Sequence, residues 1–146
     1  MKRLHIHLSV ENIEKSVAFY TRLFGTEPTA LKPDYAKWML DEPRVNFAMS
    51  SHVGEKRGVE HIGIQVEQPD ELTEVYGRIR EAGGAIFEEG ETTCCYAQSE
   101  KNWTADPDGV VWETFLTTGN VTEYGKRINA EEIAAQNTGT GECCTP

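Results

Sequence analysis

Two short segments of the chain alternate strictly between apolar and polar residues. Residues 5–10 and residues 61–66 both place isoleucine, leucine or valine at every even-numbered position. Histidine, serine, glycine or glutamine occupies every odd-numbered position of the same segments. A period of two is typical of a β-strand that buries one of its faces. We therefore expect two strands that carry His5 and His61 on their polar faces.

A helical pattern follows each of these strands. Apolar residues recur at helical spacing over residues 13–24, between Asn12 as a candidate cap and Gly25 as a stop. A second apolar stripe covers residues 69–82 and ends at Gly83-Gly84. Strand candidates come after each helix, at residues 29–31, 35–40 and 45–49 in the first half and 85–88, 96–104 and 110–116 in the second.

The two halves are related by an internal duplication with an offset of 56 residues, which aligns His5 with His61. Each half reads as a βαβββ module, and the fold class is α+β. We expect one domain at 1–117, with modules 1–52 and 59–117 joined by a linker at 51–58, and a tail at 118–146 that contains a short helix over 129–136. The alternative is an unrelated α+β domain in which one strand–helix start occurs twice by chance.

Composition narrows the class of protein. The 146 residues are 38% hydrophobic and 26% charged, which suits one globular domain. A net charge of −10 disfavours nucleic acid and anionic lipid as partners. The chain has no apolar run of the ~18–20 residues that a membrane helix needs, and its start lacks the features of a signal peptide. We expect a cytoplasmic monomer or homodimer that does not bind membranes.

Three residues form a candidate metal site. The turn Asp106-Pro107-Asp108-Gly109 precedes a strand in which Glu113 stands among large apolar residues, where an unpaired carboxylate is costly. If the modules pair around a pseudo-two-fold axis, His5 and His61 face each other across one cavity. Two imidazoles and a carboxylate form the facial triad of non-haem Fe(II) oxygenases, and the same set suits Ni, Zn or Mn. Alternatively Glu113 lies on an exposed face, and we interpret His7 and His52 as ordinary surface or core residues.

The four cysteines form two adjacent pairs, Cys94-Cys95 and Cys143-Cys144. Thiolates are soft ligands, so an adjacent pair in a loop or bend suits a thiophilic metal or metalloid. The alternative for the first pair is one buried and one exposed cysteine without a joint role. For the second pair, a dispensable solvated tail is the alternative to any role as ligands.

The chain up to about residue 117 resembles the vicinal-oxygen-chelate superfamily, which includes glyoxalase I, bleomycin-binding proteins and extradiol dioxygenases. The resemblance rests on the two histidine strands, on residues 16–20 (SVAFY) and on the Asp-Pro-Asp-Gly turn that leads to Glu113. It implies a fold in which both modules surround a cavity that holds metal and substrate. Glyoxalase I has a fourth ligand, a glutamate in the last strand of its first half. The corresponding segment here, residues 44–50, contains no acid.

A closer resemblance is to the ArsI/CadI branch of this superfamily. It rests on residues 92–97 (TTCCYA), on Lys101 and Trp103, and on residues 34–37 (DYAK). It implies an Fe(II)-dependent dioxygenase that cleaves the carbon–arsenic bond of trivalent organoarsenicals with O2. His5, His61 and Glu113 would then hold the metal and Cys94 and Cys95 the substrate. The pocket walls would be formed by Tyr96, Trp103 and Phe115, and Cys143 and Cys144 would be accessory thiols.

Two other functions stay open at this point. One is a glyoxalase-like isomerase or thiol transferase with Ni, Zn or Mn, for which the missing fourth acid is unfavourable. The other is a non-catalytic resistance protein that binds cadmium or arsenite through its thiols.

Overall fold

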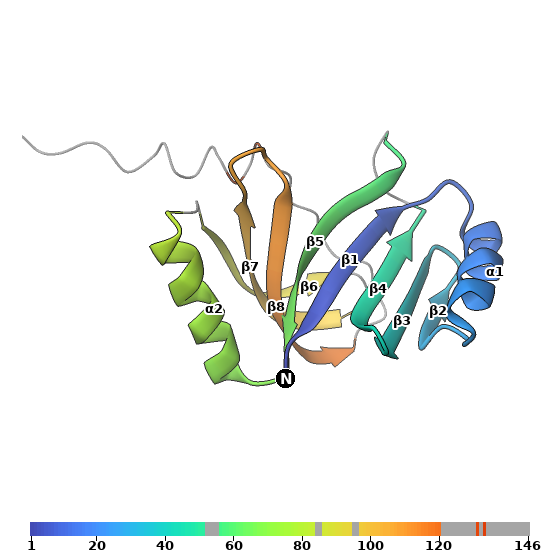
Figure 1. Cartoon of the computed structure of the whole chain (residues 1–146), viewed down its shortest axis with the longest axis horizontal. Helices are drawn as coiled ribbons and strands as arrows, with labels where there is room; N and C mark the ends of the chain where they lie inside the picture. The colour runs from blue at the N-terminus through green and yellow to red at the C-terminus, as the bar shows by residue number, and fades with distance from the viewer. Residues whose placement is uncertain (52–55, 84–85, 95–96, 121–130, 132, 134–146) are drawn as a thin grey trace, which may run out of the picture.

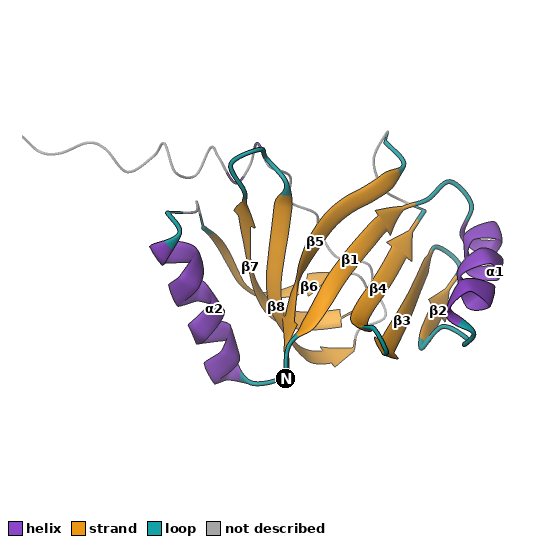
Figure 2. Cartoon of the chain, viewed as in Figure 1, coloured by secondary structure: helices purple, strands orange, loops and turns teal. Residues whose placement is uncertain are grey.

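The computed structural model describes residues 1–51, 56–83, 86–94, 97–120, 131 and 133. Both halves have the element order βαβββ that the sequence pattern predicts (Figure 2). The elements are β1 (Arg3–Ser9), α1 (Ile13–Phe24), β2 (Ala30–Lys32), β3 (Tyr35–Asp41), β4 (Arg44–Ser50), β5 (Gly58–Val66), α2 (Pro69–Glu81), β6 (Phe87–Cys94), β7 (Ala97–Ala105) and β8 (Val111–Asn120).

The ends of helix α1 follow from local chemistry. The side chain of Asn12 accepts a hydrogen bond from the backbone N–H of Lys15 at 2.8 Å, which satisfies a donor in the first turn. The helix ends at Gly25, whose φ of 67° lies in the left-handed region that favours glycine. Helix α2 has Pro69 in its first turn, where the missing N–H costs nothing.

The eight strands form one sheet in the order β2-β3-β4-β1-β5-β8-β7-β6. The first strands of the two halves meet in its centre, where β1 and β5 are antiparallel and Ile6 pairs with Ile62. These two residues are equivalent under the sequence duplication, so a pseudo-two-fold axis passes between them. His5 therefore pairs with Gly63, and His7 pairs with His61.

The helices lie at opposite ends of the sheet, α1 beside β2 and β3 and α2 beside β7 and β8 (Figure 1). Partly buried Ile6 and Leu8 of β1 pack with α1 residues around a core that includes Trp38 and Phe47. In the second half, Val66 forms the corresponding core with residues of α2. His5 and His7 of β1 lie on the other face of the sheet together with their partners Gly63 and His61 of β5, as the alternation predicts.

Strand β6 differs from expectation. The pattern predicts a strand over residues 85–88 and a loop or bend at the cysteine pair, whereas β6 continues to Cys94, which pairs with Ala97 of β7. Residues 88–93 are glutamate, glycine and threonine without any apolar alternation, so the sequence pattern does not predict this extension.

In the tail, Glu131 and Ile133 are helical, and the rest of the expected 129–136 helix lies outside the described residues. Among the described residues, no helix is long and apolar enough to cross a membrane.

Candidate metal centre

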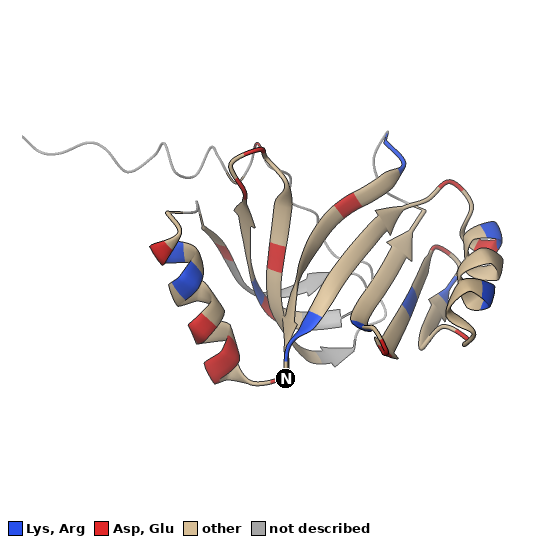
Figure 3. Ribbon diagram, viewed as in Figure 1, with Lys and Arg blue, Asp and Glu red and all other residues tan. Residues whose placement is uncertain are grey.

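The sheet brings the three predicted metal ligands together. His5 lies on β1, His61 on β5 and Glu113 on β8, three strands that are neighbours in the sheet. All three side chains are buried. Most charged residues lie on helices and loops, and isolated acidic positions within β5 and β8 stand out (Figure 3). The strand order places these ligands side by side although His5 and Glu113 are more than a hundred positions apart in the chain.

The three donor atoms form a small triangle. Nε2 of His5 lies 3.2 Å from Nε2 of His61. Oε2 of Glu113 lies 3.5 Å from the first nitrogen and 3.4 Å from the second. Two ligands bound about 2.1 Å from one ion lie about 3.0 Å apart at a right angle and about 3.4 Å apart at a tetrahedral angle. The donor set therefore fits one divalent ion that caps the triangle.

Neighbouring groups orient each donor. Nδ1 of His5 lies 3.0 Å from the backbone carbonyl of Asn46, which only accepts, so Nδ1 carries the proton and Nε2 presents its lone pair to the centre. Nδ1 of His61 lies 3.8 Å from Oε1 of Glu60. The ammonium of Lys101 lies 2.7 Å from Oε1 of Glu113, which leaves Oε2 facing the imidazoles. A neighbouring polar group thus orients each of the three ligands.

Burial and charge shift the pKa values of this cluster in different directions. Burial lowers the pKa of His5 to about 4. For His61 burial also lowers the pKa, but the carboxylates of Glu113 and Glu60 outweigh it and raise the pKa to about 9. Burial raises the pKa of Glu113, but the cation of Lys101 and His61 outweigh this and hold it well below its usual range. A proton and a divalent cation therefore compete for the lone pair on His61.

Aromatic rings enclose the centre. Trp103 lies edge-on to His61, with 5.1 Å between the ring centroids. Phe115 lies edge-on to His5 at the same centroid distance of 5.1 Å. Both residues are buried, and Phe115 lines the cavity beside the donors. The cavity beside the donors measures about 30 Å³, which is roughly the volume of one water molecule.

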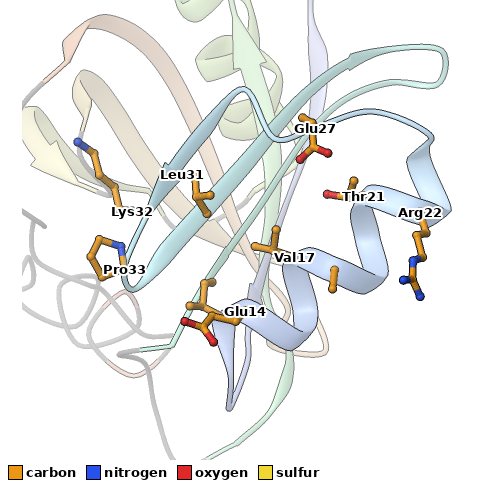
Figure 4. A pocket seen from close by; sticks show the side chains of 10 residues that line it. Glu14, Val17, Thr21, Arg22, Glu27, Leu31, Lys32 and Pro33 are labelled. Carbon is orange, nitrogen blue, oxygen red and sulfur yellow. The ribbon is translucent and has the colours of Figure 1, made fainter.

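A larger hollow of about 690 Å³ lies elsewhere, between α1 and β2. Val17, Thr21 and Leu31 are among the residues that line it, and none of the metal donors reaches it (Figure 4). Its size alone does not make it the chemical centre, because the buried titratable groups gather at the smaller cavity.

Sequence reasoning missed three residues of the centre. His7, interpreted as an ordinary surface or core residue, is only 1% exposed. A ring nitrogen of His7 belongs to a cluster with His5 and His61 in which all donor atoms lie within 4.8 Å of one another. Lys101 and Glu60 were not recognised as partners of the ligands. The sequence did contain a signal for His7. It lies two positions after His5 in an alternating strand, so both side chains share one face.

Several predicted residues lie outside what the structure describes. Cys94 ends β6, but its side chain is not described, and Cys95, Tyr96, Cys143 and Cys144 lie outside the described residues, as does His52. The roles expected for the cysteines and for Tyr96 therefore stay predictions.

Comparison with known proteins gives a family and two kinds of relative. Residues 2–114 match the Glyoxalase/Bleomycin resistance protein/Dioxygenase superfamily. The trivalent organoarsenical cleaving enzyme of Bacillus sp. (strain MD1) is 42% identical over 100% of this chain and 92% of its own length. The cadmium-induced protein CadI of Mycobacterium bovis is 30% identical over 86% of this chain and 82% of its own length.

A solved structure with a similar fold is the Mn(II)-bound glyoxalase from Novosphingobium aromaticivorans. It matches with a TM-score of 0.58 at 15% identity, and the match covers 88% of this chain and 43% of that one.

Proposed function

The chain belongs to the Glyoxalase/Bleomycin resistance protein/Dioxygenase superfamily, and from this premise we propose that it is a cytoplasmic Fe(II)-dependent dioxygenase that cleaves the carbon–arsenic bond of trivalent organoarsenicals. The Bacillus relative, whose name describes this substrate class, supports the substrate. The observation that carries the chemistry is the triangle of His5, His61 and Glu113, with edges of 3.2, 3.5 and 3.4 Å.

This donor set leaves coordination positions open. The position in the first half that corresponds to Glu113 is Ala48, since His7 pairs with Ala48 as Gly63 pairs with Glu113. A second carboxylate is therefore missing from the symmetric position. Two imidazoles and one carboxylate with open positions favour Fe(II), which when bound supplies electrons to O2. Mn, Ni and Zn are alternative ions for the same donors.

The proposed reaction balances without an external reductant. Methylarsonous acid, CH3As(OH)2, and O2 together contain the atoms of formaldehyde and arsenous acid, As(OH)3. The carbon–arsenic bond breaks. One oxygen atom of O2 goes to carbon and the other goes to arsenic. The carbon–arsenic unit supplies all four electrons that O2 accepts, so the chain needs no reducing partner.

The substrate would be held by Cys94 and Cys95, because trivalent arsenic is thiophilic and binds two thiolates. Cys94 ends β6, and β7 then runs from Ala97 to the centre at Lys101 and Trp103. Four residues of extended strand separate Ala97 from Lys101, which is about 13 Å. The proposal therefore requires the cysteine-bound arsenical to reach the ion across this length of strand.

Buried residues of the centre prepare it for this chemistry. The Lys101 ammonium holds Oε1 of Glu113, which keeps the carboxylate in one orientation. Trp103 and Phe115 pack against the imidazoles and restrict water at the donors. Such positioning and exclusion of water are what the chain itself contributes to the reaction.

Separate loss of metal and of arsenical binding tests the proposal. In Glu113→Ala, anaerobic Fe(II) binding should be lost while a trivalent methylarsenical still binds. In Cys94→Ser and Cys95→Ser, the arsenical should no longer bind tightly while Fe(II) affinity stays unchanged. Arsenite release in air should disappear in all three. Unchanged Fe(II) affinity in Glu113→Ala would contradict the triad, and arsenite release by Cys95→Ser would contradict the dithiolate.

A second candidate function is sequestration of cadmium or arsenite without bond cleavage. The relative induced by cadmium and the two cysteine pairs favour it. It predicts arsenical binding without O2 uptake. The glyoxalase-like alternative is less favoured, because Ala48 occupies the position of a fourth acid, and it predicts turnover that needs no O2.

A further inference from the structure

His7 occupies a special position relative to the pseudo-two-fold axis. The duplication makes His7 equivalent to Gly63, and the strand register makes Ala48 equivalent to Glu113. In the second half, a carboxylate stands beside a glycine. In the first half, an alanine stands beside a histidine. Each half thus carries one large polar side chain at this pair of positions. In the first half it is His7, on the first strand of the module, and in the second half it is Glu113, on the last strand.

Gly63 has a steric reason to be glycine. A Cβ atom at Gly63 would lie 2.2 Å from the backbone oxygen of Glu113. At the equivalent position in the first half, His7 carries a full side chain beside the small Ala48. Its imidazole therefore takes the side of the cavity where a symmetric molecule would place a second carboxylate.

The environment of His7 keeps the ring close to the other donors. Nε2 of His7 lies 2.9 Å from Oγ of Ser50 on β4 and 3.7 Å from Oε2 of Glu60 on β5. The rings of His7 and His61 are tilted by 34°, with 4.9 Å between their centroids. One nitrogen each of His5, His7 and His61 lie within 4.8 Å of one another.

We propose that His7 is a fourth protein ligand of the ion held by His5, His61 and Glu113. Two ligands on opposite sides of an ion, each at about 2.1 Å, are about 4.2 Å apart. The donor atoms, within 4.8 Å of one another, are close to this limit. His7 must therefore move toward the ion to enter its coordination sphere.

The effect of a fourth protein ligand depends on the coordination number that the ion prefers. Zn²⁺ favours four tetrahedral ligands, so three imidazoles and one carboxylate would complete its sphere. An ion that prefers six ligands keeps open positions even with His7 bound. With His7 bound, an ion that prefers four ligands therefore has no open coordination position. This inference concerns the donors alone and stands whether or not organoarsenicals are the substrate.

Substitution with Co²⁺ gives a direct count of imidazole ligands. Each bound imidazole carries one N–H proton whose NMR resonance is strongly shifted by paramagnetic Co²⁺ and disappears in D2O. We expect three such resonances in the wild-type protein and two in His7→Gln. Two resonances in the wild type, unchanged in His7→Gln, would overturn the proposal.

Metal affinity and a matched control complete the test. A residue that only orients a ligand typically contributes about 10–100-fold to metal affinity, so we expect His7→Gln to lose more than about 100-fold for Zn²⁺. Ser50→Ala removes the hydroxyl partner of His7 but keeps the imidazole, and should retain all three resonances.

If His7→Gln does not fold, the number of shifted N–H resonances in the wild-type Co²⁺ protein decides the question. Three resonances support the fourth ligand, whereas two contradict it.

Discussion

The close contact between β5 and β8 leads to a prediction for Gly63→Ala. A Cβ atom at this position would lie 2.2 Å from the backbone oxygen of Glu113 and 3.1 Å from its carbonyl carbon. The obstacle is backbone and not the end of a flexible side chain, so the two strands must separate by about 1 Å to restore an ordinary contact. The substitution therefore acts on the strand that carries a metal ligand.

The expected cost has two parts. Overpacking in a well-packed interior costs about 1–3 kcal/mol, and a backbone obstacle places this variant near about 3 kcal/mol. Separation of the strands also lengthens the 3.4 Å contact between Oε2 of Glu113 and Nε2 of His61. We expect metal affinity to fall by roughly 10–100-fold, as for other disturbances behind a ligand.

Urea unfolding of the metal-free protein, followed by tryptophan fluorescence, measures the first effect. Competition with a chromophoric chelator measures the second. Gly77→Ala is the matched control, because its Cβ atom would meet nothing within 4 Å. It lies inside helix α2, where alanine is favoured over glycine by about 0.5–1 kcal/mol. This variant should be more stable than the wild type, with unchanged metal affinity.

The reasoning would be refuted by a Gly63→Ala protein whose unfolding free energy lies within about 0.5 kcal/mol of the wild type and whose metal affinity is unchanged. That result would mean that β5 and β8 are not held at the close distance on which the triangle depends.

Two further predictions follow from the electrostatics of the centre. Lys101→Met removes the ammonium beside Oε1 of the buried Glu113 carboxylate and leaves it the contacts with His5 and His61. The unfolding free energy of the metal-free protein should therefore fall, by up to about 3–5 kcal/mol in urea titrations. A loss below about 1 kcal/mol would show that solvent screens the pair. The pKa of His61 is raised to about 9, so at pH 7.5 its imidazole is protonated and must release about one proton when an ion binds. Calorimetric titration in buffers of different ionisation enthalpy should detect this proton at pH 7.5 and not at pH 10, and equal heats in all buffers at pH 7.5 would contradict the shift.

The fold was accessible from sequence because two strands and two helices carry clear periodic patterns. The duplication then placed His5 and His61 at equivalent positions, independently of any chemistry. Glu113 was found because a carboxylate among large apolar residues of a strand needs a partner. These three positions depend only on local alternation and on the repeat.

The remaining parts of the centre depend on register between strands. Whether His7 faces His61 or Gly63 follows from how β1 aligns with β5, and one strand alone does not reveal this. Lys101 pairs with Phe115, and its ammonium reaches diagonally to Glu113 on the neighbouring strand. A lysine in a strand is usually exposed, so its burial could not be predicted from the pattern of β7.

The most direct test of the proposed chemistry is the ratio of O2 consumed to arsenite released. The protein, loaded with Fe(II) without oxygen and given a trivalent methylarsenical, is mixed with a limiting amount of O2 in the absence of any reductant. We predict one arsenite and one formaldehyde for each O2 consumed. Arsenical binding without O2 uptake, or arsenite release that continues without O2, would contradict the dioxygenase reaction.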